Sequence, residues 1–268
     1  MSSKLSIIVT GRNDDYDGNF DERLAIALSN NIKSLPDAEF IFVEWNPYLN
    51  KPLTCSKLSN ILGDRVKYYV VHPKYHERYC TIDGFLEYPA KNVGVRKSSR
   101  DFIICTNSDI TFAPDLVERL TGSLNEKTVY RATRIDIMLG YKYVQFPLPA
   151  KMVLGRSYGL TDASGDFLML DKGTWNDITG YCEEFPEQRL HKDSFLVHIL
   201  VNKMKLPVDV IGSMTHWRHP SSWSNGFCRS KVGDPKWDFT KAYYIRNKDT
   251  WGLSFTNEIN RDGITWLE

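Results

Sequence analysis

The sequence comprises 268 residues with 42% hydrophobic content and a formal net charge of +1, from 34 basic against 33 acidic side chains. That length suits one large α/β domain or two small ones, and the hydrophobic content suits a soluble globular core. The balanced charge provides no overall field for nucleic acid or an anionic membrane, so we expect no nucleic-acid partner.

The first hundred residues alternate apolar runs with helical periodicity. Apolar runs predict strands at residues 5–9, 39–45, 66–71 and 102–105. Leucine and isoleucine at helical spacing predict helices over residues 24–35 and 58–62. A further helix is expected over residues 89–99, and residues 72–87 are expected to be irregular. Crossovers of this length between strands imply a mostly parallel, right-handed α/β sheet flanked by helices.

The remaining chain continues the pattern less regularly. We expect strands at residues 128–135, 163–171 and 207–211, and helices at 114–120, at 172–178 and from 191 onward. Residues 139–162 have no clear period, and so long a connection is usually functional, so we expect it to border an acceptor site. The tail, 221–268, is too aromatic for disorder and is expected to pack on the domain formed by residues 1–220.

Cysteines and the N-terminus bear on the compartment. Five cysteines are scattered without a Cys-x-x-Cys pair, which indicates a reducing compartment and no zinc knuckle. The first strand begins too early for a signal peptide, and no apolar run approaches the roughly 18 residues of a membrane span. We therefore expect a cytoplasmic protein without a membrane span.

The stretch between residues 101 and 115 carries the clearest functional signal. Its apolar run predicts a strand buried on both faces, and the run stops at Asn107, Ser108 and Asp109. A carboxylate then stands at the carboxyl end of a parallel strand, where open α/β sheets bind ligands and where Mg²⁺ or Mn²⁺ can bridge to phosphate. An Asx-type turn explains the same residues, so both interpretations stay open.

Two other features could serve a ligand at that edge. Lys91 and Arg96 lie on the helix before the strand and could neutralise phosphate, although a solvated helix face is the alternative. Asp166 follows Gly165 at the mouth of a later strand, where a small residue lets a ligand approach closely. We expect Asp166 to accept hydrogen bonds from sugar hydroxyls, with a turn residue as the alternative.

Taken together, five short motifs resemble a GT-A glycosyltransferase over residues 5–220. They are Ile-Ile-Val-Thr-Gly-Arg-Asn-Asp near the N-terminus, Asn-Ser-Asp after the fourth strand, Gly165-Asp166-Phe167, His191-Lys192-Asp193, and the late pair His216 and His219. More narrowly, the chain is similar to the small capsid-glycan glycosyltransferases of large algal viruses, which would place it in the host cytoplasm. Each motif is weak alone, and their order is the more specific signal.

The resemblance implies a GT-A, Rossmann-like fold and a nucleotide-diphosphate-sugar donor, with UDP-sugar expected, and an oligosaccharide or glycoprotein acceptor. Beside Lys91, Arg96 and Ser108, which we place in the donor-binding group ourselves, it assigns the nucleotide to Thr10, Gly11, Arg12, Asp14 and Glu44 and the ribose to Asn107. It assigns the metal to Asp109 with His216 or His219, and Trp217 joins Asp166 on the sugar and acceptor side. Imidazole suits Mn²⁺ better than Mg²⁺, so Mn²⁺ is the expected ion. The family motif usually opens with Asp where this chain has Asn107.

The resemblance also supports Asp193 as the general base of an inverting transfer. Inversion needs a carboxylate opposite the leaving diphosphate to take the acceptor's proton. Helix capping is the alternative role for an Asp in a first helical turn, and Glu183 or Glu184 would substitute if the register differs.

Two other functions remain open. A sugar-phosphate nucleotidylyltransferase shares the sheet and metal chemistry, but it would be expected to carry a Gly-rich loop after the first strand, which Gly11-Arg12-Asn13-Asp14 does not supply. A catalytically silent sugar-binding module could use the aromatic tail as its platform.

Overall fold

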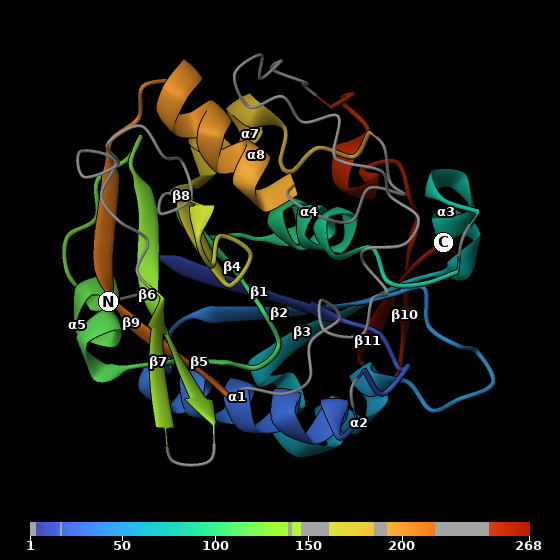
Figure 1. The fold of residues 1–268 in the computed structure, drawn as a ribbon. Helices are drawn as coiled ribbons and strands as arrows, with labels where there is room; N and C mark the ends of the chain where they lie inside the picture. Colours follow the sequence, from blue (N-terminus) through green and yellow to red (C-terminus); the bar gives the residue numbers. More distant parts are fainter. Residues whose placement is uncertain are drawn as a thin grey trace.

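The computed structural model describes residues 4–16, 18–81, 83–138, 141–145, 161–184, 192–217 and 247–268. Within these ranges the strands form a single sheet in the order β10-β11-β3-β2-β1-β4-β8-β6-β9-β5, and β7 pairs with β6. Helices cover both faces, which gives three layers (Figure 1). The expectation of an α/β fold with a central sheet and flanking helices is confirmed.

The N-terminal part of the sheet is parallel. Its strands are β1 (Leu5–Gly11), β2 (Glu39–Trp45), β3 (Val66–Val71) and β4 (Phe102–Thr106). Strand β1 pairs in parallel with both β2 and β4, and β3 pairs in parallel with β2. Every residue of β1, β2 and β4 is buried, as expected for apolar runs covered on both faces. The carboxyl ends of these strands therefore meet at one edge of the sheet.

Beyond β4 the sheet is mixed, so the prediction of a mostly parallel sheet is wrong for this part. Strand β8 (Phe167–Asp171) runs antiparallel to β4 and to β6 (Val129–Met138). Strand β9 (Val208–Trp217) runs parallel to β6 and antiparallel to β5 (Ile110–Phe112), and β7 (Tyr141–Gln145) runs antiparallel to β6. The sequence predicted that this strand ends at residue 211, whereas β9 continues to Trp217. The polar residues in its second half interrupt the apolar pattern from which strands were predicted.

The described part of the C-terminal tail completes the other end of the sheet. Strand β11 (Ile264–Leu267) pairs in parallel with β3, and β10 (Glu258–Arg261) pairs antiparallel with β11. A short 3-10 helix, Trp251–Leu253, packs on the helix formed by Glu87–Lys97, α4. The expected boundary between residues 220 and 221, and most of the aromatic segment after it, lie outside the described residues.

The helices divide between the two faces. On one face lie α1 (Phe20–Ser34), α2 (Thr54–Leu62) and α5 (Pro114–Thr121), whose apolar residues join one hydrophobic cluster. On the other lie α4 (Glu87–Lys97), α7 (Lys172–Ile178) and α8 (Lys192–His198), which continues into a π-helical turn, Ile199–Lys203. Helix α3 (Pro73–Tyr79) occupies part of the segment expected to be irregular.

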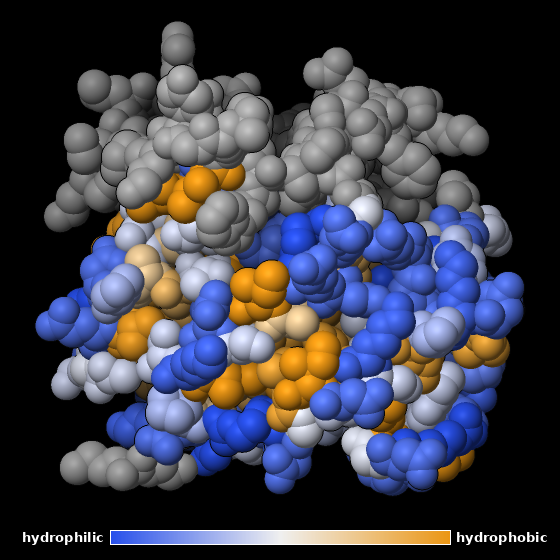
Figure 2. Space-filling view, turned by 90° about the horizontal axis from the view of Figure 1, so that it is seen from below, coloured by the Kyte–Doolittle hydropathy of each residue, from blue (hydrophilic) through white to orange (hydrophobic). Residues whose placement is uncertain are grey.

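The outer surface of α1 and α2 is largely hydrophilic. Figure 2 shows this side, with a group of hydrophobic residues near its centre. Among the exposed large hydrophobic side chains, Ile26 belongs to α1 and Ile61 to α2. Inside this layer, the buried Asn31 of α1 forms two hydrogen bonds with β5: its amide nitrogen donates to the Ile110 carbonyl at 2.9 Å, and its oxygen accepts from the Phe112 N–H at 2.9 Å.

Candidate functional site

The turn between β4 and β5 brings Asp109 to His216. Strand β5 begins directly after Asp109, and its first residue, Ile110, lies opposite His216 in the β5–β9 ladder. The His216 Nε2 lies 3.4 Å from the Asp109 Oδ2, and the two side chains are 9% and 12% exposed. A carboxylate and an imidazole that are far apart in sequence therefore converge at the carboxyl end of β4.

Asp136 on β6 holds the opposite side of the same imidazole ring. Asp136 lies opposite His216 in the parallel β6–β9 ladder, and its Oδ1 lies 2.8 Å from the His216 Nδ1. In the tautomer with its proton on Nδ1, the ring donates to Asp136 and its Nε2 lone pair faces Asp109, whereas in the other tautomer Nδ1 accepts from Arg134. Carboxylates commonly orient metal-binding histidines in this way. Asp136 was not anticipated from the sequence.

Arg134 ties this group to Asp166. Its Nε donates to the Asp136 Oδ1 at 2.6 Å, one terminal nitrogen donates to the Asp166 Oδ2 at 2.6 Å, and the other lies 2.9 Å from the His216 Nδ1. Burial alone would lower the pKa of Arg134, but the Asp166 and Asp136 carboxylates outweigh burial and raise it. The guanidinium is therefore a fixed positive charge between two carboxylates.

Asn107 is braced from both sides. Its Oδ1 accepts from the Lys91 Nζ at 2.9 Å, and its Nδ2 donates to the Asp166 Oδ1 at 2.7 Å. Asp166 is 5% exposed, and each of its carboxylate oxygens takes a protein donor, Asn107 on one and Arg134 on the other. In the structure Asp166 fixes the turn, and its predicted contact with sugar hydroxyls stays a prediction.

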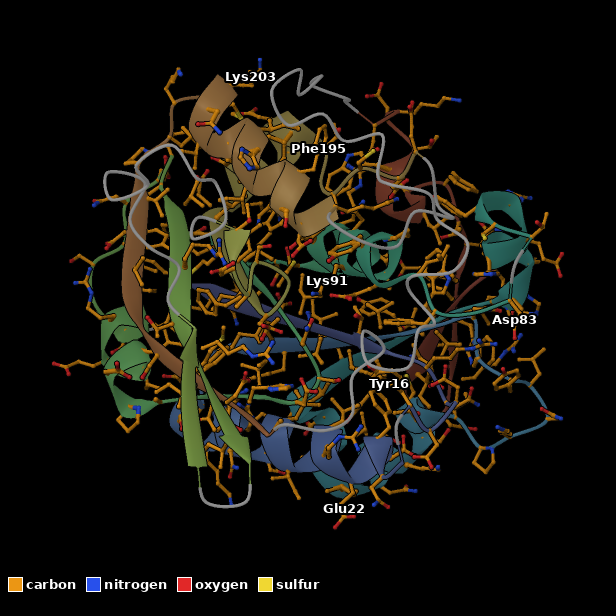
Figure 3. All side chains as sticks on the ribbon, in the orientation of Figure 1. Tyr16, Glu22, Asp83, Lys91, Phe195 and Lys203 are labelled. Atoms are coloured by element: carbon orange, nitrogen blue, oxygen red, sulfur yellow. The ribbon has the colours of Figure 1, made fainter. Side chains whose placement is uncertain are left out.

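Lys91 donates hydrogen bonds to the residues that hold the Asn107 turn and has no donor left for a phosphate. The side chain is fully buried, and the ammonium group donates to Glu87, to the Asn107 Oδ1 and, at 2.8 Å, to the Gly165 carbonyl. Those bonds use the three donors of an ammonium group. Figure 3 labels Lys91 on α4, above the sheet. The predicted role of Lys91 in neutralising phosphate is therefore not supported by its geometry.

Arg96 lies at the wrong end of α4 for the site. Because α4 ends just before β4 begins, its last turn stands at the opposite edge of the sheet from Asp109. The Arg96 guanidinium donates to the Asp249 carbonyl at 3.2 Å and stacks 4.8 Å from the ring centroid of Trp251. We therefore withdraw Arg96 from the donor-binding group.

Asp193 lies beside Gly165 in the first turn of α8. One of its carboxylate oxygens, Oδ2, accepts a hydrogen bond from the Ser164 Oγ, and this oxygen would lie 3.4 Å from a Cβ added at Gly165. The Glu87 Oε1 would lie 3.8 Å from that same Cβ. Burial raises the pKa of Glu87, and the Asp193 charge adds to this increase although Lys91 opposes it. Glycine thus leaves room between two carboxylates.

Three of the residues assigned to the donor have packing roles. Glu44 is fully buried, and its two oxygens accept from the backbone N–H groups of Thr54 at 3.0 Å and Cys55 at 2.8 Å, which caps α2. A Cβ at Gly11 would lie 2.5 Å from the Phe20 Cζ, so this glycine admits an aromatic ring. Thr10 is buried in the same strand. The predicted ligand role of Glu44 is corrected because both oxygens are used inside the core.

Arg12 and Asp14 follow β1 at the ligand edge. The Arg12 guanidinium donates to the Asn46 carbonyl and to the Asp83 Oδ1, both at 2.7 Å, and stacks 4.0 Å from the Tyr48 ring centroid. Burial raises the pKa of Asp14 although Arg12 opposes it. Arg12 therefore organises the surface beside the carboxyl ends of β1 and β2.

The other predicted residues are placed only in part. Ser108 lies half-buried between Asn107 and Asp109. The backbone of Trp217 ends β9, but its side chain and all of His219 lie outside the described part of the structure. His216 is therefore the histidine of the pair that can be placed beside Asp109.

The donor set at Asp109 fits a divalent cation shared with a ligand. Two neighbouring ligands of a small octahedral cation, each about 2.1 Å from it, lie roughly 3 Å apart, close to the separation of the Asp109 and His216 atoms. No group of three histidine, cysteine, aspartate or glutamate side chains able to hold a metal occurs among the described residues. Phosphate oxygens of a substrate would have to complete such a site.

A separate cleft of about 390 Å³ opens beside the β1–α1 connection. Among its lining residues, Asp15 accepts from the Phe20 N–H at 3.0 Å and Asp21 accepts from the Thr54 hydroxyl at 2.7 Å. These carboxylates hold local structure, and Asp109 and His216 do not line the cleft. We assign it no ligand.

Comparisons with known proteins identify the fold. No protein-family model matches the chain, and no curated protein matches its sequence. The mannosyltransferase PcManGT from Pyrobaculum calidifontis, solved with GDP-Man and Mn²⁺, aligns with a TM-score of 0.53 and 12% identity over 84% of this chain. TarS from S. aureus aligns with a TM-score of 0.53 and 13% identity over 80% of this chain.

These alignments span 59% of the mannosyltransferase and 37% of TarS. At such identities the likeness shows the fold alone: this chain has the α/β fold of these proteins, in agreement with the expected GT-A architecture. The similarity to algal-virus enzymes stays a prediction. In the described part of the chain, no helix is both long and apolar enough to cross a bilayer.

Proposed function

We propose that this protein is a metal-dependent glycosyltransferase that moves a sugar from a nucleoside-diphosphate donor to a hydroxyl group of a glycan. The observation that carries the proposal is the 3.4 Å approach of the Asp109 carboxylate to the His216 imidazole at the carboxyl end of β4. The supporting context is a fold shared with a mannosyltransferase that was solved with GDP-Man and Mn²⁺.

Asp109 and His216 would hold the cation, with Mn²⁺ expected because imidazole is a poor ligand for Mg²⁺. A bound divalent cation would neutralise the negative charge that develops on the leaving diphosphate. The chain's own contribution is to hold both ligands rigidly, through the β5–β9 ladder and the Asp136 contact to the far side of the ring. Such preorganisation avoids a reorganisation cost when charge develops.

Asp193 is our candidate for the general base of an inverting transfer. Its carboxylate would take the proton of the acceptor hydroxyl while that oxygen bonds to the anomeric carbon, and the nucleoside diphosphate would leave with the electron pair of the broken bond. Ser164 donates a hydrogen bond to Asp193, which fixes the carboxylate beside Gly165. The Lys91 ammonium group donates hydrogen bonds both to the Gly165 carbonyl and to Asn107. The same lysine therefore holds the segment beside the general base and the Asn107 turn.

The donor nucleotide has two precedents with different bases. The resemblance seen in the sequence implies a UDP-sugar, and the solved mannosyltransferase holds GDP-Man. The proposed function requires the diphosphate that both share. A nucleotidylyltransferase would instead consume a nucleoside triphosphate and a sugar phosphate, and a sugar-binding module would turn over neither.

The test is nucleoside-diphosphate release from UDP- and GDP-sugars with Mn²⁺, with and without EDTA. Wild-type protein should release diphosphate slowly even without acceptor, and Asp109→Ala should lose this release while it keeps its melting temperature within a few degrees. Asp209→Asn, an exposed carboxylate paired with Arg119 at 3.3 Å, is the matched control and should behave as wild type. Release that survives both EDTA and Asp109→Ala would exclude the proposed metal site.

A further inference from the structure

Lys192 is a buried lysine directly before the proposed general base. It is the first residue of α8 and is 2% exposed. Its ammonium group donates to the Cys182 carbonyl at 2.9 Å and to the Glu184 carbonyl at 3.1 Å. A charge is costly to bury unless hydrogen bonds compensate it, and both acceptors belong to one short segment. The lysine therefore fastens the first turn of α8 to residues 182–184.

That segment is held in turn by the buried carboxylate of Glu183. Its Oε1 accepts from the Asn92 amide at 2.9 Å and from the Gly252 N–H at 2.8 Å, and its Oε2 accepts from the Tyr79 hydroxyl at 3.1 Å. Burial raises the pKa of Glu183, although these hydrogen bonds and the Lys192 charge oppose it. Both oxygens are used inside the protein, so Glu183 is an anchor, and its predicted role as a substitute for the general base is corrected.

Asn247 fixes the same segment from the C-terminal part of the chain. Its Oδ1 accepts from the Glu183 N–H at 2.8 Å, and its Nδ2 donates to the Thr179 and Tyr181 carbonyls, both at 2.6 Å. The side chain is buried, and such buried amides hold backbone groups that water cannot reach. A residue far from Asp193 in sequence thus holds the backbone to which Lys192 is bonded.

The Asp193 carboxylate is oriented by two hydroxyl groups. Ser164 donates to its Oδ2, and the Tyr88 hydroxyl also donates to this carboxylate. Burial and the Asp193 charge raise the pKa of Tyr88, which keeps the phenol protonated as a donor. These hydroxyls fix the end of the side chain, and Lys192 fixes the backbone from which it starts. A displacement of about 1 Å in a reacting group can cost about 100-fold in rate.

We propose that Lys192 is a positioning residue for the general base Asp193 and that Asn247 acts on the transfer through it. The inference rests on the proposed glycosyltransferase function and adds two residues that hold the base without touching substrate. The metal ligands Asp109 and His216 are held separately, by the ladders of β5, β6 and β9. Loss of Lys192 should therefore slow the chemical step and leave nucleotide binding unchanged.

The experiment is a double-mutant cycle between Lys192→Met and Asp193→Asn on the full chain. The kcat for nucleoside-diphosphate release from UDP- and GDP-sugars with Mn²⁺ is measured, with water as the acceptor, and calorimetry gives the affinity for the nucleoside diphosphate. Lys192→Met should lower kcat about 10- to 100-fold at unchanged affinity. In the Asp193→Asn background the same substitution should change kcat less than about threefold, because residues that act through one another are not additive.

Two further variants complete the design. Lys172→Met is the matched control, since Lys172 opens α7 as Lys192 opens α8 and donates to the Ser98 carbonyl at 2.9 Å; it should keep the wild-type kcat. Asn247→Ala leaves Lys192 in place and should lower kcat about 3- to 10-fold, again only when Asp193 is present. It carries the test if Lys192→Met does not fold.

Each outcome decides a different point. Wild-type protein that releases no nucleoside diphosphate would overturn the proposed function and this inference with it. Full activity of Asp193→Asn would remove the general base and the inference, while metal-dependent transfer stands. Equal losses of kcat in both backgrounds, or a parallel loss of nucleotide affinity, would show that Lys192 and Asn247 only support the fold. Losses of kcat that require Asp193 and spare nucleotide affinity would support the inference.

Discussion

Replacing Asn107 by Asp tests whether this residue is a metal ligand or a brace. The substitution restores the Asp that opens the motif in the resembled family, so a ligand role predicts tighter metal binding. The structure predicts otherwise, because the Asn107 Nδ2 donates to the Asp166 Oδ1 at 2.7 Å and a carboxylate at that point would set two anionic oxygens against each other.

The magnitude follows from three contributions. Two like charges about 4 Å apart repel by about 4 kcal/mol at an effective dielectric constant near 20. Lys91, 2.9 Å from the Asn107 Oδ1, gains an attraction of similar size from the new charge, so these two contributions largely cancel. The lost hydrogen bond to a charged acceptor then sets the scale, about 1.5 to 3 kcal/mol of unfolding free energy.

Denaturant unfolding at about pH 8 and about pH 5 distinguishes this variant from Asn107→Ala. In Asn107→Asp the neighbouring carboxylate raises the folded-state pKa of one carboxyl, so protonation restores a donor between the oxygens and the stability deficit shrinks as pH falls. The Asn107→Ala deficit should stay constant between these pH values. The reasoning is refuted if Asn107→Asp matches wild-type stability at pH 8 and binds Mn²⁺ more tightly with nucleoside diphosphate.

Three further predictions concern other carboxylates. Asp136→Asn should weaken Mn²⁺ binding about 10- to 100-fold, measured by electron paramagnetic resonance with nucleoside diphosphate present, because His216 loses its orienting partner; an unchanged affinity would remove Asp136 from this role. Asp193→Asn should keep donor affinity and lower the transfer rate about 100-fold, and product anomericity by NMR checks inversion. Glu39 accepts hydrogen bonds from Ser6, Lys67 and Ser99, which outweigh burial and lower its pKa to about 2. Glu39→Gln should therefore destabilise at pH 7, and the difference should fade as pH falls from about 4.5 toward 2; a constant difference would contradict the shifted pKa.

The sequence predicted best those elements that are buried on both faces. Strands β1, β2 and β4 are buried along their whole length, and β3 carries one exposed residue, Lys67; the parallel pairing of the four follows from the helices between them. Helix α3 was missed although Pro73 stands at its first position and the His72 side chain accepts from the Lys74 N–H at its start. Strand β5 was missed because three residues are too few to show a period.

The candidate site was predicted only where a residue follows a buried strand. Asp109 was predicted because it follows the buried strand β4, and His216 was predicted from the resemblance to a glycosyltransferase family. Arg134 and Asp136 gave no local signal, because charged residues in a strand read as its solvent face until β9 is known to lie beside β6. Lys91 and Glu44 were assigned to the ligand because a sequence does not reveal that a charged group is enclosed by protein donors or acceptors.

The contact between Asn31 and β5 bears on how the molecule behaves at high concentration. Strand β5 ends the sheet, and an open terminal strand can template the addition of a strand from another molecule. The Asn31 amide satisfies the Ile110 carbonyl and the Phe112 N–H as a neighbouring strand would. Because the Asn31 side chain already occupies these two backbone groups, it blocks the addition of a strand at this point of the edge, directly after Asp109.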